Sequence, residues 1–463
     1  MITAAERIAS FPAAKSLERA APAPVVVGNG RWSIGEWFIV SQTALPAVLL
    51  LPGTQAFRLP LRIAPYAISL ALLVRWVHRG GLRGRLHPAR VWLAAVVSLL
   101  VLMLVHPTTN TLLSAAAQIG LYLSVMAPAL WMPECVRGCA HARRLLLVML
   151  VCNGINACVG VMQVYDPERW MPAEISARVT NSDYGLDRVS YRGPDGYTVI
   201  RPPGLFDNPG AVAGPATYAG LLGVVFATAP GPIPIRIVAG FLAVAGVAAI
   251  CLSFVRTSLI VLGGMFVVYV GLLLRRAEFG RLLIVVPFVV AVGLGGFSIG
   301  ARLGGDAIVE RFGTLRDEGA DAYSNAGRTE QLQYGVGDLL FRFPLGAGLG
   351  RWGMMQEYFG DPLSENAPPI WAELQPNAWI LDGGLLLVVF YVGALVITTR
   401  YNVRLIERPP HRGMRWLASI VMAANAGVIA LIFGFTPFTN QIGMQYWLLT
   451  GVLHGAALRE HTR

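Results

Sequence analysis

This 463-residue chain has little charge of either sign. Only 14% of its residues are charged, whereas soluble domains usually carry about 25%. Hydrophobic residues make up 55% of the chain, and its mean hydropathy is +0.57. The composition therefore argues against an ordinary soluble domain and predicts an all-α polytopic membrane protein.

Lysine is almost missing, because Lys15 is the only one among the 37 basic residues. The net charge of +11 would suit a nucleic-acid-binding protein, but the arginines lie in short clusters between apolar runs. That placement is typical of membrane topology, so we expect no nucleic-acid partner. The first thirty residues have no apolar core long enough for a signal peptide. We interpret residues 1–34 as a disordered cytoplasmic tail.

The long polar segments contain no cysteine, which excludes a disulfide framework there. All five cysteines lie in or beside apolar runs: Cys135, Cys139, Cys152, Cys158 and Cys251. The spacing of Cys135 and Cys139 is a weak indication of a metal site, and two free thiols near a helix end are the favoured interpretation. We expect neither a metal nor another cofactor.

Apolar runs of the length that a membrane helix needs, about 20 residues, occur about twelve times. The expected spans form three groups, 35–164 with five, 210–299 with four and 377–457 with three. Residues 458–463 then form a short tail. The individual segments are 36–52, 61–77, 91–105, 111–131, 145–164, 210–229, 236–253, 258–274, 282–299, 377–398, 416–434 and 441–457.

Arginines in the short connections predict the orientation of these spans, because cytoplasmic loops carry an excess of positive residues. With twelve spans, every basic cluster falls on one side, which is then the cytoplasm and holds both termini. The clusters are Arg75, Arg79, Arg83, Arg85 and Arg90; Arg137, Arg143 and Arg144; Arg236; Arg275, Arg276 and Arg281; and Arg400, Arg404, Arg408, Arg412 and Arg415.

Two long polar segments, 165–209 and 300–376, then face outward. The first holds seven acids and five arginines, and the second holds eleven acids and six arginines. Connections longer than about 12–15 residues are usually functional or disordered. These two contain tryptophan, tyrosine and hydrophobic pairs, so we expect folded extracytoplasmic loops that carry any chemistry.

Arginines at the outer ends of the spans are the first candidates for a binding site. Arg201 in "VIRPPGLFDNPG" precedes two prolines that restrict the backbone, and a guanidinium held there can bind a phosphate through two parallel hydrogen bonds. The plain alternative is an interfacial arginine that snorkels to the membrane surface. Arg256 in "SFVRTS" lies in a very short outer turn, where a polar cavity or an anionic ligand would stabilise it.

The second loop adds two further motifs. Arg328 in "AGRTEQLQYG" begins an expected amphipathic helix that runs to about Phe341. "FPLGAGLGRWG" contains the spacing Gly348, Gly350 and Gly353 of a dinucleotide loop, but no βαβ unit surrounds it. A glycine-rich turn packed against helix ends is therefore the favoured interpretation.

Acids and histidines supply the candidates for acid–base chemistry. Among the seven histidines only His106 is expected on the outer face, and Glu365, Glu373 and Asp382 are the candidate carboxylates. Glu373 stands out because an apolar setting beside nearby tryptophans would suit a general base. The acidic run Asp317, Glu318 and Asp321 could bind a cation, although a solvated loop is favoured.

Four motifs in order resemble the O-antigen ligase and O-antigen polymerase superfamily of bacterial envelope glycosyltransferases. They are "RPPGLFDNPGAVAG", "SFVRTSLIVLGG", "GRTEQLQYGVGDLLFRFPLGAGLG" and "NAWILDGGLLLVVFYVG", and they cover about residues 199–395. The resemblance implies a GT-C-like fold in the bacterial inner membrane, with large external loops. It also implies metal-independent transfer of an undecaprenyl-pyrophosphate-linked glycan to an acceptor hydroxyl on a glycan or lipid, within a polysaccharide assembly machinery.

The resemblance further implies that Arg201 and Arg256 hold the pyrophosphate, with Arg328 and Glu373 as catalytic candidates. An external histidine precedes the "NAWIL" motif in the family, but this chain has "LQPNAW" there. Glu373 or another group replaces the histidine, or the mechanism differs, or this branch has another role. Gln375, Asn377 and His106 are the accessory candidates.

Two other functions remain open at this point. Because the family histidine is missing, a non-catalytic polysaccharide assembly factor is one alternative. A twelve-helix transporter is the other, although the unequal external loops disfavour the two related halves typical of transporters. The choice between polymerase and ligase depends on acceptor recognition, which the motifs do not reveal.

Overall fold

The computed structural model describes residues 31–84, 86–172, 190–192, 198–206, 208–317 and 327–460. The expected N-terminal tail, up to residue 30, therefore lies outside the described residues. A helix lies over each of the twelve segments that the sequence predicted as spans. These are α1 Ile34–Ala47, α2 Arg58–His78, α3 Arg90–Leu102, α4 Leu112–Met126 with α5 Pro128–Cys135, α6 Cys139–Tyr165, α9 Ala213–Thr228, α10 Ile233–Leu252, α11 Arg256–Arg275, α12 Phe279–Gly304, α18 Gln375–Glu407, α19 Arg412–Ala430 and α20 Gln441–Glu460.

Eight of these helices are long and apolar enough to cross a membrane, when α4 and α5 are counted as one. Three further apolar helices are shorter: Ile34–Leu50, Arg90–Val105 and Ala213–Thr228. The last helix, α20, has the length but a less apolar sequence, and most of its residues are buried in the bundle. The described structure is compatible with an all-α, multi-pass membrane protein.

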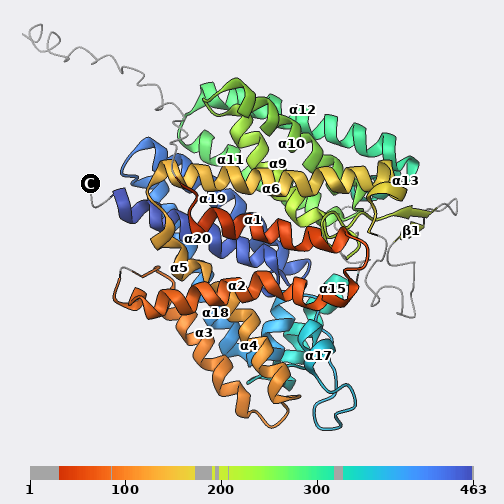
Figure 1. Ribbon diagram of the computed structural model, residues 1–463, viewed down its shortest axis with the longest axis vertical. Coiled ribbons are helices and arrows are strands. Elements are labelled where there is room, and N and C mark those ends of the chain that lie inside the picture. The colour runs from red at the N-terminus through yellow and green to blue at the C-terminus, as the bar shows by residue number, and fades with distance from the viewer. Residues whose placement is uncertain are drawn as a thin grey trace, which may run out of the picture.

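The helices pack in two neighbouring groups (Figure 1). In one group α10 contacts α6, α9 and α12. In the other, α18 contacts α3, and α17 (Gly353–Phe359) contacts α4. α19 and α20 contact each other and join the groups, since α19 packs on both α11 and α18 and α20 packs on both α5 and α6.

α18 is longer than its predicted span, which ended near residue 398. It continues to Glu407 and carries Arg400 and Arg404 within the helix instead of in a loop. Arg404 lies in the last turn, where a positive side chain interacts favourably with the negative end of the helix dipole. This accounts for a helix that extends past the apolar run.

The segment 300–376, which the sequence analysis expects as the second external loop, is largely helical where the structure describes it. It contains α13 Asp306–Asp317, α15 Arg328–Tyr334, a π-helical turn Gly335–Leu339 and α16 Leu340–Arg342. The prediction of a helix from Arg328 to about Phe341 is confirmed, with the π turn in its middle. Asp317 ends α13, whereas Glu318 and Asp321 of the suggested cation site lie outside the described residues.

The described part of the segment 165–209, expected as the first external loop, contains a short helix and two paired strands. The helix is α7 Pro167–Trp170, and the strands are β1 Ser190–Arg192 and β2 Thr198–Ile200. The strands are antiparallel, with Ser190 opposite Ile200, and form the one sheet in the described residues. The hairpin matters for the site, because β2 ends directly before Arg201.

The glycine-rich segment 343–353 packs against helix ends, as the sequence predicted. The amide of Ala347 donates to the carbonyl of Leu381 at 2.7 Å, so the segment lies along the first part of α18. A β-carbon at Gly348 would lie 2.3 Å from the carbonyl oxygen of Thr108, so no larger residue fits there. The glycines thus serve close backbone packing.

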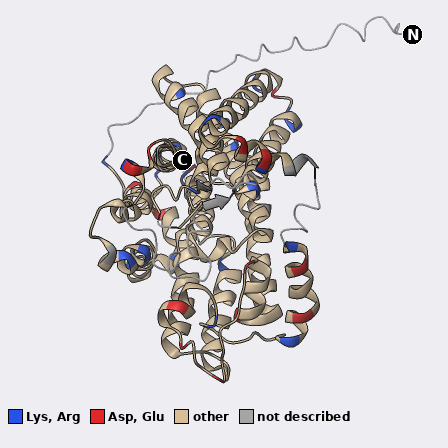
Figure 2. Cartoon of the chain, turned by 90° about the vertical axis from the view of Figure 1, so that its right-hand side faces the viewer, with Lys and Arg blue, Asp and Glu red and all other residues tan. Residues whose placement is uncertain are grey.

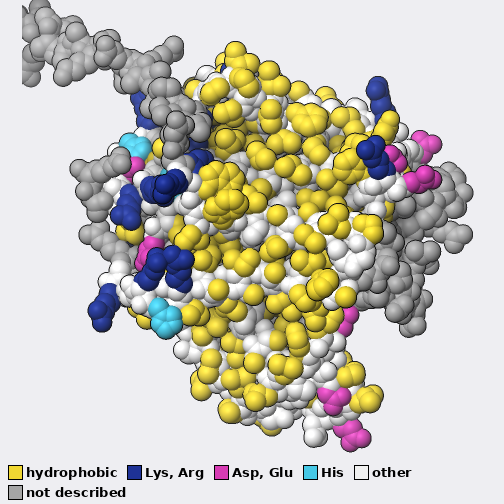
Figure 3. Space-filling model, in the orientation of Figure 1, with side chains coloured by type: hydrophobic (Ala, Val, Ile, Leu, Met, Phe, Trp, Pro, Cys, Tyr) yellow, Lys and Arg dark blue, Asp and Glu magenta, His cyan; other side chains and the backbone are white. Residues whose placement is uncertain are grey.

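Charge is distributed unequally between the two ends of the molecule. Figure 3 shows arginine and histidine side chains gathered near the C-terminus, a broad hydrophobic face, and acidic side chains mainly towards the opposite edge. Figure 2, which looks onto that opposite edge, shows helices with few charged residues and short basic and acidic stretches. Basic side chains are therefore concentrated at the end that carries the C-terminus but are not confined to it.

Candidate functional site

A tight turn at residues 253–255 joins α10 to α11 near the hairpin β1–β2. The hydroxyl of Ser253 donates to the carbonyl of Ile250 at 2.6 Å and accepts from the amide of Val255 at 3.2 Å. Phe254 between them has φ 58°, in the left-handed region that non-glycine residues rarely adopt. Such a conformation costs about 1–3 kcal/mol and persists only where the surroundings fix it, so this turn is rigid.

Arg201 reaches this turn from the hairpin. Its Nε–H donates to the carbonyl of Ser253 at 3.1 Å. A β-carbon at Gly210 would lie 2.8 Å from a terminal nitrogen of Arg201, so glycine there lets the guanidinium lie against the backbone. Burial and, to a smaller degree, the guanidinium of Arg311 lower the pKa of Arg201 from its ordinary value. Arg201 is therefore held in place at a position rich in positive charge.

Arg256 and Arg328 share the same turn. Arg256 is the first residue of α11, and Arg328 is the first residue of α15. A terminal N–H of Arg328 donates to the hydroxyl of Thr257 at 2.8 Å. The contacts of Arg201 and Arg328 therefore fall just before and just after Arg256. We call residues 253–257 with these three arginines the arginine turn.

The hydrogen-bond partners of Arg201 and Arg328 are neutral oxygens. Within the described part of the chain, neither Arg201 nor Arg328 forms an ion pair with a carboxylate. A guanidinium has five N–H donors, and one bond to a carbonyl or hydroxyl leaves others for a ligand. Carboxylates and phosphates are the groups that fit such a fork best.

The short helix α15 connects the arginine turn to Glu373. Arg328 and Gln331 are three residues apart and thus neighbours on one face of this helix. The side-chain amide of Gln331 donates to the carboxylate of Glu373 at 2.7 Å, and its backbone carbonyl accepts from Asn377 at 2.9 Å. Arg328, Glu373 and Asn377, which the sequence suggested separately, are thus connected through α15.

Glu373 and Asn377 line a cavity of about 310 Å³. The wall also includes Gln331, Arg342, Arg351 and aromatic side chains such as Tyr334 and Trp371. Trp371 is 70% exposed, and Glu373 is half-buried and hydrogen-bonded to an amide. The setting of Glu373 is therefore more polar than the apolar environment expected from the sequence.

Arg351 is a cavity residue that the sequence interpretation missed. It is buried and donates to two backbone carbonyls, Pro368 at 3.0 Å and Ala347 at 2.7 Å. Burial, followed by the charge of Arg342, lowers the pKa of Arg351. A lone arginine inside a glycine-rich segment was the available signal, because such a segment has few side chains of its own to solvate it.

Arg62, in the second turn of α2, is another residue that the sequence interpretation missed. Its two terminal nitrogens donate to the hydroxyl of Tyr358 at 2.7 Å and to the side-chain carbonyl of Asn208 at 3.2 Å. It therefore joins the segment 165–209 to the segment 300–376. An arginine at the start of an apolar run was the signal for this role.

Two accessory candidates have other local roles. Gln375 is fully buried, and its side-chain oxygen accepts from the backbone amide of Phe438 at 2.8 Å. His106 lies 3.0 Å from the hydroxyl of Thr108, and it is not among the residues that line the cavity. Burial and the nearby charge of Arg351 lower the pKa of His106.

The remaining candidate carboxylates also lie outside the cavity lining. Asp382 is fully buried and accepts hydrogen bonds from Gln118 at 3.1 Å, Tyr122 at 2.7 Å and Trp352 at 2.8 Å. It ties α18 to α4 and to the glycine-rich segment. Glu365 is exposed in the second loop.

Metal-ligand side chains converge elsewhere in the described residues. Neither the arginine turn nor the cavity brings together three such groups, whereas Cys139, His411 and Glu460 do so at the end that carries the C-terminus. Cys135, the other half of the suggested cysteine pair, is not part of that group.

No protein-family model matches this chain, and no curated protein matches its sequence. The resemblance to the O-antigen ligase and polymerase superfamily therefore rests on the four sequence motifs alone.

Proposed function

We propose that this protein is a membrane glycosyltransferase that moves a glycan from undecaprenyl pyrophosphate to an acceptor hydroxyl. The observation that carries the proposal is the arginine turn. Arg201, Arg256 and Arg328 come from segments far apart in the sequence and meet at one rigid turn, and two of them bond to neutral oxygens. A pyrophosphate supplies the negative charge that such a site favours.

In the proposed reaction the acceptor oxygen attacks the anomeric carbon of the donor sugar. The bond from that carbon to the pyrophosphate oxygen breaks, and the electron pair leaves with the pyrophosphate. Arginines fixed beside this group stabilise the charge that develops on it, which lowers the barrier without a metal. Glu373 takes the proton of the acceptor hydroxyl, and its bond to Gln331 orients the carboxylate.

The proposal includes a topology of twelve spans with both termini in the cytoplasm of a bacterial inner membrane. Twelve helical segments, the basic clusters at one end and the acidic external loops support it. Asn366→Cys in the second loop and Arg408→Cys in the loop between α18 and α19 test it, since both positions are exposed. In a cysteine-free background, an impermeant thiol reagent should label only the first in intact spheroplasts. Labelling of Arg408→Cys alone would reverse the orientation.

A non-catalytic role in polysaccharide assembly is the second candidate. Its support is Gln375, which stands where the family has a histidine. The side-chain oxygen of Gln375 accepts a hydrogen bond from the amide of Phe438. No catalytic group then occupies that position. A non-catalytic factor could still bind the lipid-linked glycan through the arginine turn.

Substitutions of Arg201 at matched membrane levels test the transferase. Lysine keeps the charge but lacks the planar fork, so Arg201→Lys should lower polymer or conjugate yield about as Arg201→Ala does. Losing a charged hydrogen bond worth roughly 1.5–3 kcal/mol lowers the rate by about tenfold to a hundredfold. Cells should accumulate the lipid-linked donor. Wild-type yield from both variants would remove Arg201 from the site.

Purified protein separates the two candidate functions. With lipid-linked donor and acceptor glycan, a transferase should form the new glycosidic bond and release undecaprenyl pyrophosphate. Donor binding without bond formation would favour the assembly factor. If the protein neither binds the donor nor forms the glycosidic bond, both candidate functions are contradicted.

A further inference from the structure

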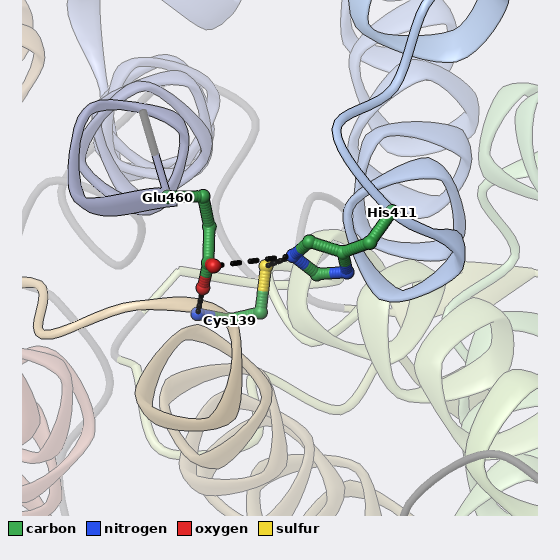
Figure 4. A group of neighbouring side chains, drawn as sticks. All are labelled: Cys139, His411 and Glu460. Carbon is green, nitrogen blue, oxygen red and sulfur yellow. Dashed lines mark hydrogen bonds and ion pairs between the residues drawn. The ribbon is translucent and has the colours of Figure 1, made fainter. Parts of the chain in front are cut away.

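We propose that Cys139, His411 and Glu460 bind one divalent metal ion of the zinc class. Figure 4 shows the three side chains converging, and Glu460 is the last described residue before the C-terminus, which Figure 1 marks. Cys139 is the first residue of α6, His411 is the N-cap of α19, and Glu460 is the last residue of α20. The thiol and the imidazole are 272 residues apart in the chain, so their convergence depends on the fold.

The distances between the ligand atoms match the edges of a tetrahedral site. Zinc bonds of about 2.3 Å to sulfur, 2.05 Å to nitrogen and 2.1 Å to oxygen give tetrahedral edges of about 3.6 Å for S···N and 3.4 Å for N···O. Here Cys139 Sγ lies 3.6 Å from His411 Nε2, and His411 Nε2 lies 3.5 Å from Glu460 Oε2. All three ligand atoms lie within 4.8 Å of one another.

The same distances are less suited to hydrogen bonds within the group. A good N–H···O bond has a length of 2.7–3.2 Å, so the 3.5 Å separation of His411 and Glu460 is long. A thiol is a weak donor and a weak acceptor. The three side chains are therefore joined only by long contacts, together with a 3.5 Å bond from the amide of Cys139 to Glu460 Oε1, and a cation at their centre would bind all three more strongly.

The ligand set fits zinc better than the hard cations. Zinc is bound by thiolate, imidazole and carboxylate, whereas magnesium and calcium prefer oxygen ligands only. Three protein ligands leave the fourth position for water or a further ligand. The ion would tie the end of α20 to the starts of α6 and α19.

Metal binding requires two proton movements. The Cys139 thiol loses its proton to solvent. His411 Nδ1 accepts from the amides of Gly413 at 3.1 Å and Met414 at 3.3 Å, so the neutral ring carries its proton on Nε2. On binding, that proton moves to Nδ1 and the ring gives up these cap bonds. The free energy lost with this helix cap is small compared with the binding free energy of a zinc site.

Cobalt is the probe for the experiment, because a thiolate bound to Co²⁺ gives a charge-transfer absorption band. The whole chain is purified in detergent without a polyhistidine tag, reduced, stripped of metal and titrated with Co²⁺. Wild-type protein should bind one Co²⁺ per chain with this band, and Zn²⁺ should displace it. Cys139→Ser should abolish the band. Cys135→Ser is the matched control and should keep it, since its thiol contacts the carbonyl of Trp131 instead.

Two further variants test the other ligands. His411→Asn retains an oxygen that can cap α19 but removes the imidazole, and Glu460→Gln removes the charge. Each should weaken Co²⁺ binding at least tenfold while the protein stays monodisperse with an unchanged melting temperature in the metal-free form. Absence of the band in the wild type, its persistence in Cys139→Ser, or wild-type affinity in both other variants would overturn the proposal. None of these outcomes bears on the transferase.

Discussion

Charged side chains have different kinds of partner at the two ends of the bundle. Near the C-terminal end, the fully buried carboxylate of Glu36 lies 2.9 Å from His141 Nε2 and accepts from Arg144 at 2.7 Å. The amide of Ser33 donates to its other oxygen at 2.7 Å. At the other end, Arg201 and Arg328 are held by a carbonyl and a hydroxyl.

We call Glu36 with His141 and Arg144 the closed cluster, because its charges are paired within the protein. The arginine turn is open by comparison. Around Glu36, donors and acceptor come from the protein itself, so the cluster holds α1 against α6 and has no need of a ligand. At the arginine turn, neutral oxygens fix the guanidiniums without neutralising them. Substitutions at the first cluster should therefore change stability, and substitutions at the second should change activity.

The largest expected effect is on the transfer rate. Glu373→Gln removes the base but can keep a hydrogen bond to Gln331, so the fold should persist. General base catalysis contributes about 10²–10⁴-fold, and the rate with purified donor and acceptor should fall by that order. Glu365→Gln, at an exposed acid outside the cavity, is the control. A Glu373→Gln rate within threefold of wild type would assign the base elsewhere.

The next effect is on stability at the closed cluster. Glu36→Ala leaves His141 and Arg144 without their carboxylate, and breaking a buried ion pair costs about 3–5 kcal/mol. The free energy of unfolding in detergent should fall by that amount, whereas Arg201→Ala should change it much less. Equal losses from both variants would erase the distinction between the two ends.

The positions of the helices could be predicted from the sequence, because apolar runs of about twenty residues have few other structures available in a membrane. The convergence of Arg201 and Arg328 on one turn could not be predicted from the sequence. Arg201 contacts a residue 52 positions away and Arg328 contacts one 71 positions away, and no local pattern encodes such distances. The burial of Gln375 and the bond between Glu373 and Gln331 depend likewise on how α15 and α18 pack.

The cluster at Cys139 shows the same limit. Spacing along the chain paired Cys139 with Cys135, four residues earlier, since local motifs are what a sequence displays. The fold instead brings His411 and Glu460 to this thiol. Burial of Arg351 in the glycine-rich segment was missed for a similar reason, because its carbonyl partners are backbone groups without any sequence signature.

The smallest expected effect is at His106. Its ring bonds to Thr108 and does not line the cavity, so His106→Gln should leave transfer within about threefold of wild type. The yield of polymer or conjugate at matched protein level is the measurement. A loss comparable to that of Glu373→Gln would mean that His106, and not Glu373, serves as the external base.

Binding of a polyprenyl pyrophosphate to the purified protein tests the arginine turn most directly, because it needs neither acceptor nor turnover. The wild type should bind the pyrophosphate more tightly than the matching polyprenyl monophosphate. Arg201→Lys should weaken pyrophosphate binding about tenfold to a hundredfold, which corresponds to ~1.5–3 kcal/mol. Arg408→Lys, an exposed arginine at the other end, should not change it. Equal affinity of wild type and Arg201→Lys for the pyrophosphate would contradict the account.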